Sequence, residues 1–288
     1  MTLHLELDEA GALSEATVSR VSDKVAPPRT DQAVPTGELE DHLASLLAPH
    51  SFEADQYRVL RQFLAEAREV RPLKVLAVTS PAAGDGKTTT AINLAATLAQ
   101  TPGSRVLLVD TDLRRPFVAA NLGLDPSGPG LAEGAADERL ELSELVQSTP
   151  YDLAVLPAGV PPANAYQALE SARVGQLLEQ ARESYDCIVL DTPPVLLVPD
   201  CKLMSQWVDG FLLVVAAHRT PRKLLGEALN AMDEAKLLGI VVNGDDRPVA
   251  GYYGKYYGGY YHEPASHGPS GWRHSWKRDR KSRRSPWR

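Results

Sequence analysis

The sequence predicts an α/β fold built on a doubly wound, mostly parallel β-sheet. First, short apolar segments alternate with longer amphipathic segments from about residue 72 to residue 243, a pattern typical of a parallel sheet covered by helices on both faces. Second, two of the apolar segments end in aspartate, as strands do where an open α/β sheet forms its ligand crevice. Third, the 288 residues are 43% hydrophobic, which is enough for one medium-sized core.

The expected elements can be placed in order along the chain. A short amphipathic helix is expected within residues 37–50, and a longer helix should begin at Ser51 and end before Pro72. A loop-rich segment should follow the second strand, and a short helix should lie near Lys202. The expected strands are 74–80, 105–110, 152–159, 187–191, 211–217 and 238–243, with further helices beginning at Lys87, about Ala165 and Pro221.

These elements predict three regions. Residues 1–50 form a flexible arm, residues 51–250 a single doubly wound domain, and residues 251–288 a tail that is tyrosine-rich and then basic. The net charge is −7, yet residues 262–288 hold eight Lys or Arg and two Asp or Glu, so the rest of the chain carries −13. An acidic body argues against a nucleic-acid-binding face.

Several classes of protein are disfavoured by what the chain lacks. Cys187 and Cys201 are the only cysteines and form no CxxC pair, so we expect buried thiols and no disulfide framework or metal site. The N-terminus has neither a basic region nor an apolar core typical of a signal peptide. No apolar run approaches the ~20 residues of a membrane span. We therefore expect a soluble, cytoplasmic protein.

The segment "SPAAGDGKTTT" (residues 80–90) follows the first strand and opens a helix, which is the context of a phosphate-binding loop. Gly84 and Gly86 let backbone N–H groups face a phosphate, and the helix N-terminus favours the same anion. Lys87 supplies a positive charge, and the Thr88 hydroxyl is a ligand for Mg²⁺. The strict pattern GxxxxGK[ST] is broken by Pro81. The alternative is an ordinary glycine-rich turn.

Three carboxylates lie at strand ends. Asp110 and Asp112 follow the strand "VLLV", and Asp191 ends "CIVLD". Two like charges one residue apart are costly unless a cation lies nearby, and Mg²⁺ would supply it. The alternative for Asp112 is that it caps the following turn. Together with Lys87, these acids predict an ATP and Mg²⁺ site in a P-loop NTPase (Rossmann-like) fold.

The sequence resembles the bacterial tyrosine kinases of capsule and exopolysaccharide systems, P-loop proteins related to the partition and division-site ATPases. The resemblance covers about residues 51–261 and includes "SPAAGDGKTTT", "VLLVDTDLR", "LPAGVPPANAYQAL", "IVLDTPPVLLVPD", "GFLLVVAAHRT" and "GIVVNGDD". It implies that Asp110 is the base that accepts the phenol proton, that Asp112 and Asp191 hold the water shell of Mg²⁺, and that Arg114 adds positive charge. The implied catalytic residues are Lys87, Asp110 and Asp112, the metal site is Thr88, Asp112 and Asp191, and the ATP-binding residues are Ala83, Gly84, Asp85, Gly86, Lys87, Thr88, Thr89 and Asn243.

The segment "GYYGKYYGGYY" (residues 251–261) holds six of the ten tyrosines. Its glycines disfavour a helix by about 1 kcal/mol each, and a strand would place aromatic rings on both faces. The family resemblance implies autophosphorylation sites on a mobile tail, at Tyr252, Tyr253, Tyr256, Tyr257, Tyr260 and Tyr261. The alternative is a low-complexity aromatic segment.

The resemblance also implies partners. The family's Glu-x-x-Arg-x-x-Arg motif corresponds to Asp55, Arg58 and Arg61, so a ring-like homo-oligomer that phosphorylates in trans is expected; the alternative is a solvated helix face. A separate membrane co-polymerase would act as activator, and a tyrosine phosphatase would reverse the reaction. The basic tail, with Trp272, Trp276 and Trp287, suits the anionic inner face of the cell membrane, although a solvated tail and RNA binding are alternatives.

Competing functions follow from the same motifs. The first alternative is a ParA/MinD-like ATPase switch that positions cargo at membrane or nucleoid. That group's loop has a lysine five residues before the main lysine, where this chain has Ala82, so the sequence favours the tyrosine autokinase that controls polysaccharide polymerisation and export. A scaffold that binds nucleotide without catalysis is a second alternative. A dinucleotide enzyme is disfavoured, because the loop is not GxGxxG.

Overall fold

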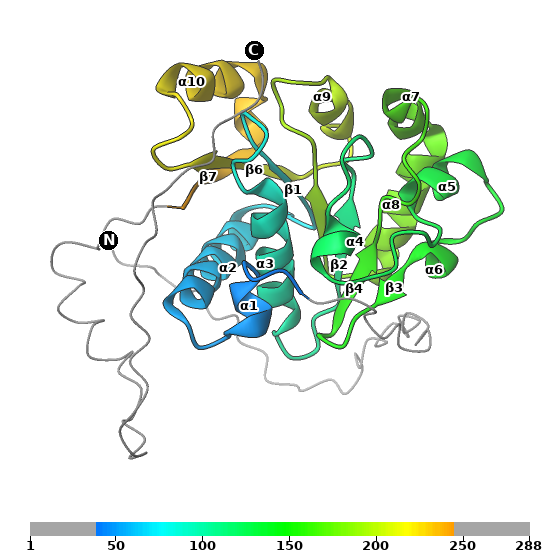
Figure 1. Ribbon diagram of the computed structural model, residues 1–288, viewed down its shortest axis with the longest axis horizontal. Coiled ribbons are helices and arrows are strands. Elements are labelled where there is room, and N and C mark those ends of the chain that lie inside the picture. Colours follow the sequence, from blue (N-terminus) through cyan, green and yellow to red (C-terminus); the bar gives the residue numbers. More distant parts are fainter. Residues whose placement is uncertain (1–38, 245–288) are drawn as a thin grey trace, which may run out of the picture. The chain divides into compact units, whose positions relative to one another are not determined.

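The computed structural model describes residues 39–244 and is built on one seven-stranded sheet (Figure 1). The strand order is β3-β4-β2-β5-β1-β6-β7, with β3 antiparallel to β4 and all other pairs parallel. The predicted fold class, a mostly parallel doubly wound sheet, is confirmed. The strands are β1 (Val75–Thr79), β2 (Val106–Asp110), β3 (Gln147–Ser148), β4 (Leu153–Leu156), β5 (Cys187–Asp191), β6 (Gly210–Ala216) and β7 (Leu237–Asn243).

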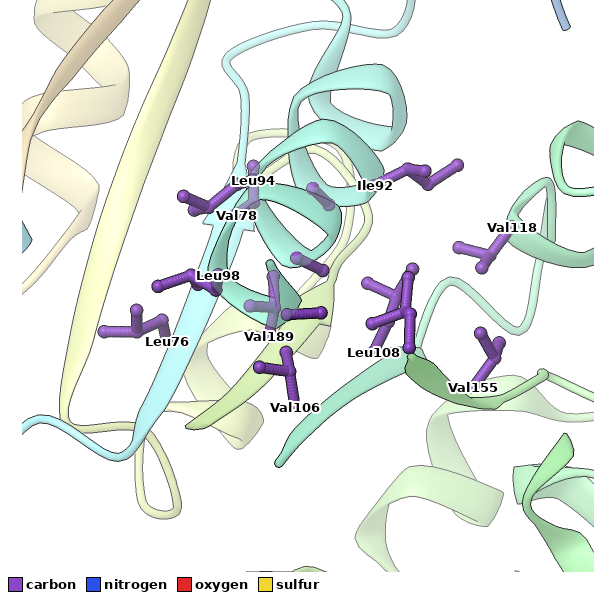
Figure 2. Packing of buried hydrophobic residues seen from close by; sticks show 14 of the residues in the cluster. Leu76, Val78, Ile92, Leu94, Leu98, Val106, Leu108, Val118, Val155 and Val189 are labelled. Carbon is purple, nitrogen blue, oxygen red and sulfur yellow. The ribbon is translucent and has the colours of Figure 1, made fainter. Parts of the chain in front are cut away.

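The central strands are apolar because both of their faces are covered. Every residue of β1, β2, β5 and β6 is buried. In Figure 2, Leu94 and Leu98 of α3 (Lys87–Ala99) lie with Leu76, Val78 and Val189 of the sheet, in the core on one face. A second core on the other face includes Leu177 and Leu178 of α8 (Ala172–Ser184). These two cores fix the strand ends from which the candidate site is built.

The remaining helices connect the strands. They are α1 (Ala44–Leu47), α2 (Phe52–Val70), α4 (Val118–Asn121), α5 (Leu131–Ala136), α6 (Leu142–Leu145), α7 (Ala165–Glu170), α9 (Asp200–Met204), α10 (Arg222–Ala231) and the short 3₁₀ helix η1 (Glu234–Lys236). As expected, α2 begins after Ser51, whose hydroxyl caps it by accepting the Ala54 N–H at 3.1 Å. It ends before Pro72, which cannot continue a helix.

Residues 39–50, which the sequence assigns to the N-terminal arm, pack against α3. Leu43 and Ser45 are buried. The Asn93 side chain accepts the Ser45 N–H at 2.8 Å and donates to the His42 carbonyl at 3.0 Å, while Thr97 Oγ1 donates to Ser45 Oγ at 2.9 Å. The helix expected within 37–50 is reduced to α1, because the His42 carbonyl before it accepts a hydrogen bond from Asn93.

Two local predictions need correction and one is confirmed. The loop-rich segment after β2 contains α4, α5 and α6, together with β3, which pairs antiparallel with β4. The helix expected from Ala165 is two helices, because Ser171 interrupts the first and caps the second by accepting the Arg173 N–H at 3.2 Å. The expected buried thiols are confirmed, since Cys187 and Cys201 are free and buried.

Two further expectations concern membranes and the chain ends. Among residues 39–244, no helix combines the length and apolar character that crossing a bilayer requires. The tyrosine segment, the basic tail and residues 1–38 lie outside the described residues.

Candidate functional site

The phosphate loop connects β1 to α3, and its two glycines have backbone angles that other residues rarely adopt. Gly84 has φ +85° and Gly86 has φ +93°. A Cβ added to Gly86 would lie 1.8 Å from the Asn243 side-chain nitrogen, so this position also lacks room for a side chain. Both the dihedral angle and the space therefore require glycine at 86.

Side chains from the loops after β6 and β7 hold the phosphate loop in place. Asp85 is buried and accepts hydrogen bonds from the Ala82 N–H at 3.1 Å and from Thr220 Oγ1 at 2.8 Å. Asn243, which the family resemblance includes among the ATP-binding residues, donates from Nδ2 to the Asp85 carbonyl at 3.1 Å. Asn243 therefore lies at the phosphate loop and shapes it. The sequence missed Thr220.

The sequence-predicted cation, hydroxyl and carboxylates meet at the carboxyl ends of β2 and β5. Lys87 Nζ lies 2.9 Å from Asp112 Oδ2 and 3.4 Å from Asp191 Oδ1. Thr88 Oγ1 donates to Asp191 Oδ2 at 2.7 Å. Strands β2 and β5 are neighbours in the sheet, with Asp110 opposite Asp191. Residues about a hundred positions apart in the chain are thus brought into one cluster.

Asp110 is completely covered, as is Asp191, but it differs from the other two acids because all of its hydrogen bonds come from backbone N–H groups. Its Oδ1 accepts the Asp112 N–H at 3.1 Å, and its Oδ2 accepts the N–H groups of Phe117 and Val118 at 3.1 and 3.0 Å. Burial, and then the negative charge of Asp191, raise the pKa of Asp110 to about 8, against the opposing effects of the Val118 N–H and Lys87. In this state Asp110 is mostly protonated at neutral pH.

The other charges of the cluster depend on one another. Burial raises the pKa of Asp191, although Lys87 and the Thr88 hydroxyl oppose this. Burial by itself lowers the pKa of Lys87, but Asp191 and Asp112 outweigh it and hold the pKa above its ordinary value. The lysine ammonium therefore pairs with two buried carboxylates.

The donor set of this cluster fits Mg²⁺, which prefers oxygen ligands and keeps several of its waters. Thr88 Oγ1 lies 2.7 Å from Asp191, and Lys87 joins Asp191 to Asp112, so one hydroxyl and two carboxylates are available together. Within residues 39–244, no three His, Cys, Asp or Glu side chains are arranged to bind a metal by themselves. Phosphate oxygens and water would have to complete the coordination.

Hydrogen bonding to Asp200 and, to a smaller extent, the charge of Asp112 raise the pKa of Arg114, so its positive charge lies near the acid cluster. Its guanidinium forms two hydrogen bonds with the carboxylate of Asp200, at 3.0 and 3.2 Å. Asp200 is buried at the start of α9. Arg114 therefore connects the loop after β2 to the start of α9. No local pattern in the sequence marks Asp200 as its partner.

The remaining predicted site residues lie in or near the loop and α2. Ala83 is exposed in the phosphate loop, and Thr89 lies in the first turn of α3. In the proposed oligomer motif, Arg58 pairs with Asp55 and also donates to the Pro49 carbonyl. Arg61 donates to the Thr97 carbonyl at 3.0 Å. Both arginines thus have partners within the chain.

Comparison with known proteins adds to this geometry. A family model described as an AAA domain matches residues 73–207. Tyrosine-protein kinase YwqD of Bacillus subtilis is 34% identical over 223 residues, which cover 76% of this chain and 92% of YwqD. The kinase domain of the Escherichia coli tyrosine kinase ETK superimposes with a TM-score of 0.66 and 29% identity, covering 70% of this chain and 79% of that domain. Succinoglycan biosynthesis transport protein ExoP of Rhizobium meliloti is 30% identical over 80% of this chain and 30% of its own length.

Proposed function

We propose that this chain, which belongs to the bacterial tyrosine kinase family, is an ATP-dependent autokinase that phosphorylates its own C-terminal tyrosines. The observation that carries the proposal is the contact of Lys87 and Thr88 with Asp112 and Asp191. It joins a phosphate loop to strand-end acids, as phosphoryl transfer needs. The tyrosine segment supplies acceptors on the same chain.

In the proposed reaction, the bond between the γ-phosphorus and the oxygen that bridges it to the β-phosphate breaks, and a tyrosine phenol oxygen bonds to that phosphorus. ADP leaves, and the phenol proton passes to a carboxylate. Lys87 supplies positive charge to the β- and γ-phosphates, while Thr88, Asp112 and Asp191 hold Mg²⁺ or its waters. When bound, Mg²⁺ neutralises phosphate charge.

Asp110 in its ionised form is the proposed base. Because its pKa is raised to about 8 in the absence of Mg²⁺, it must first lose its proton, which the positive charge of bound Mg²⁺ would favour. A phenol has a pKa of about 10 and is mostly protonated at neutral pH, so a carboxylate within hydrogen-bond reach is needed. Asp110 is covered and accepts three backbone N–H groups, so it must give up at least one of them to meet a phenol. Asp112 is 4% exposed, and Asp112→Asn beside Asp110→Asn would assign the base.

The finer parts of the proposal concern assembly and location. We propose that residues 51–250 form the kinase domain, and that Asp55, Arg58 and Arg61 support a ring-like oligomer in which tyrosines are phosphorylated in trans. A membrane co-polymerase would activate the kinase, and a phosphatase would reverse its product. The basic tail would bring the cytoplasmic protein to the inner face of the membrane, where it regulates capsular or exopolysaccharide polymerisation and export.

The test is incubation of the purified full chain with ATP and Mg²⁺, followed by mass spectrometry of phosphotyrosine, with and without the cytoplasmic segment of a co-expressed activator. Phosphate on Tyr252–Tyr261 that is absent from Lys87→Met and Asp110→Asn would support the autokinase. ATP hydrolysis without phosphotyrosine, even with the activator, would instead indicate a positioning ATPase.

A further inference from the structure

The loop between β6 and α10 places an arginine against the phosphate loop. A Cβ built on Gly84 would lie 3.3 Å from a guanidinium nitrogen of Arg219. Arg219 and the two other side chains that reach this loop, Thr220 and Asn243, come from the carboxyl ends of β6 and β7. Arg219 lies beside Gly84, Thr220 and Asn243 both donate to Asp85, and Asn243 also lies against Gly86.

The backbone that carries Arg219 is a tight turn. The N–H groups of Arg219 and Thr220 both donate to the Ala216 carbonyl, at 3.3 and 3.0 Å. Thr220 Oγ1 also accepts the Ala216 N–H at 2.9 Å while it donates to Asp85. His218, within this turn, has φ +59°. These contacts hold the Arg219 backbone in a fixed position beside the phosphate loop.

The charge of Arg219 is available for a ligand. Within residues 39–244, its guanidinium forms no hydrogen bond or ion pair, and the residue is exposed. The nearby Asp85 carboxylate is already bonded to Ala82 and Thr220. Lys87, the other cation of the loop, is paired with Asp112 and Asp191. Arg219 therefore lies beside the phosphate loop, and no other described residue neutralises its positive charge.

We propose that Arg219 binds the phosphate groups of the nucleotide, as a second cation beside Lys87. This inference rests on the proposed nucleotide site and adds a binding residue to it. A guanidinium presents several N–H donors in a planar fork that matches phosphate oxygens. A charge-assisted hydrogen bond of this kind corresponds to roughly a tenfold change in Kd at an exposed position.

The test is nucleotide binding, measured by calorimetry with Mg-ADP and separately with tripolyphosphate, a probe that has no base or ribose. Arg219→Gln should raise the Kd of both ligands by about tenfold, and Arg219→Lys by less. Arg222→Gln is the matched control, since it removes the same charge from an exposed residue three positions away and should change either Kd less than about twofold. The loss should shrink at high salt, because salt screens exposed charges.

Three outcomes would overturn the inference. An unchanged Kd in Arg219→Gln would show that Arg219 only packs on Gly84. Equal losses in Arg219→Gln and Arg222→Gln would show a general effect of charge, and a loss for Mg-ADP alone would place the contact at the base or ribose. If the wild-type chain bound neither ligand, the proposed nucleotide site would be contradicted as well. In contrast, Arg219-dependent binding without phosphotyrosine would support this inference while contradicting the autokinase.

Discussion

The two halves of the sheet's carboxyl edge are held together in different ways. On the side of β6 and β7, the phosphate loop is fixed mainly by hydrogen bonds of Thr220 and Asn243 to Asp85. On the side of β2 and β5, the contacts join the buried charges of Lys87, Asp112 and Asp191. The first half has its shape before any ligand binds. The second half contains more acidic than basic side chains. Its charge is balanced only when a carboxylate takes up a proton or a further cation binds.

This difference predicts that phosphate binding and the response to pH and Mg²⁺ depend on different halves of the edge. A loop fixed by hydrogen bonds, with no ion pair among the bonds of Thr220 and Asn243 to Asp85, should bind phosphate in a way that depends little on pH. A buried cluster of three acids and one lysine should respond strongly to pH and to Mg²⁺, because each carboxylate there alters the ionisation of the others. The variants below test whether the two halves behave independently.

The largest effect is expected from Lys87→Met, which removes the only cation of the acid cluster within the described residues. Phosphotyrosine formation should fall by at least about 100-fold, as is typical when a charge-stabilising donor is lost. Quantitative mass spectrometry of the tail measures this. Lys223→Met, at an exposed lysine of α10, should keep wild-type activity. If Lys87→Met retained more than a tenth of the activity, the acid half would not be the catalytic half.

The second effect concerns pH. Between the ordinary value of 3.8 and about 8, folded Asp110 keeps a proton that the unfolded chain has lost. The Mg²⁺-free protein should therefore lose stability as pH rises from 5 to 8, by up to about 1.4 kcal/mol per pH unit for one proton. The raised pKa of Asp191 acts in the same direction. Urea unfolding with a chelator at each pH measures the slope.

Asp110→Asn should flatten this slope, because the amide does not titrate. Asp137→Asn is its control, since hydrogen bonds from Arg139 lower the pKa of Asp137 to about 2, outside the window. A slope that stayed unchanged in Asp110→Asn would assign the pH dependence to another group. Mg²⁺ should restore stability at pH 8, because it favours the ionised carboxylates.

The third effect tests the phosphate-loop half through Gly86→Ala. The added Cβ would clash with Asn243 and require a strained φ of +93°, which we expect to cost about 1–3 kcal/mol. Nucleotide Kd should rise tenfold or more by calorimetry. Gly103→Ala is the control, because Gly103 has φ +77° but nothing within 4 Å of its added Cβ. It should affect stability and leave nucleotide binding intact. Equal binding losses would mean that the clash at Gly86 is irrelevant.

The smallest effect is expected from Thr220→Val, which removes the hydroxyl between Asp85 and the Ala216 N–H. Loss of these hydrogen bonds should destabilise the protein by about 1 kcal/mol and raise nucleotide Kd a few-fold, with little change in the pH slope. Thr220→Ser should restore both values. If Thr220→Val changed the pH slope as much as Asp110→Asn does, the two halves would be coupled and the comparison would fail.

The sequence predicted the parts of the site that depend on local pattern. The phosphate loop follows a buried strand, and Asp110, Asp112 and Asp191 follow or end apolar strands, so a parallel sheet necessarily brings them to one edge. The contact of Lys87 with Asp112 and Asp191 follows from neighbouring strands. Amphipathic character was also sufficient for α2, whereas α3, which is buried on nearly all sides, was predicted from its place after the phosphate loop.

The sequence could not predict contacts that depend on strand order. Thr220 lies 135 residues from Asp85, and Asp200 lies 86 residues from Arg114. Neither pair carries a spacing signal, because β6 becomes the neighbour of β1 only in the folded sheet. The burial of Asp110 could not be predicted either. It depends on the path of the loop after β2, which brings the N–H groups of Phe117 and Val118 to the Asp110 carboxylate. The polar residues after each strand that borders β1 would have been the signal to examine.

The segment 39–50 has a mechanical consequence. It is bonded to α3 through Asn93 and Thr97, and the Glu40 N–H is bonded to the Asn121 carbonyl, at the end of α4, at 3.1 Å. Helix α3 begins at Lys87, and α4 begins at Val118, whose N–H holds Asp110. One short segment is thus bonded to both helices that start at the proposed catalytic edge of the sheet. A force applied to the chain before Leu39 would be transmitted to both helices at once, so tension there would reach the phosphate loop and the proposed base together.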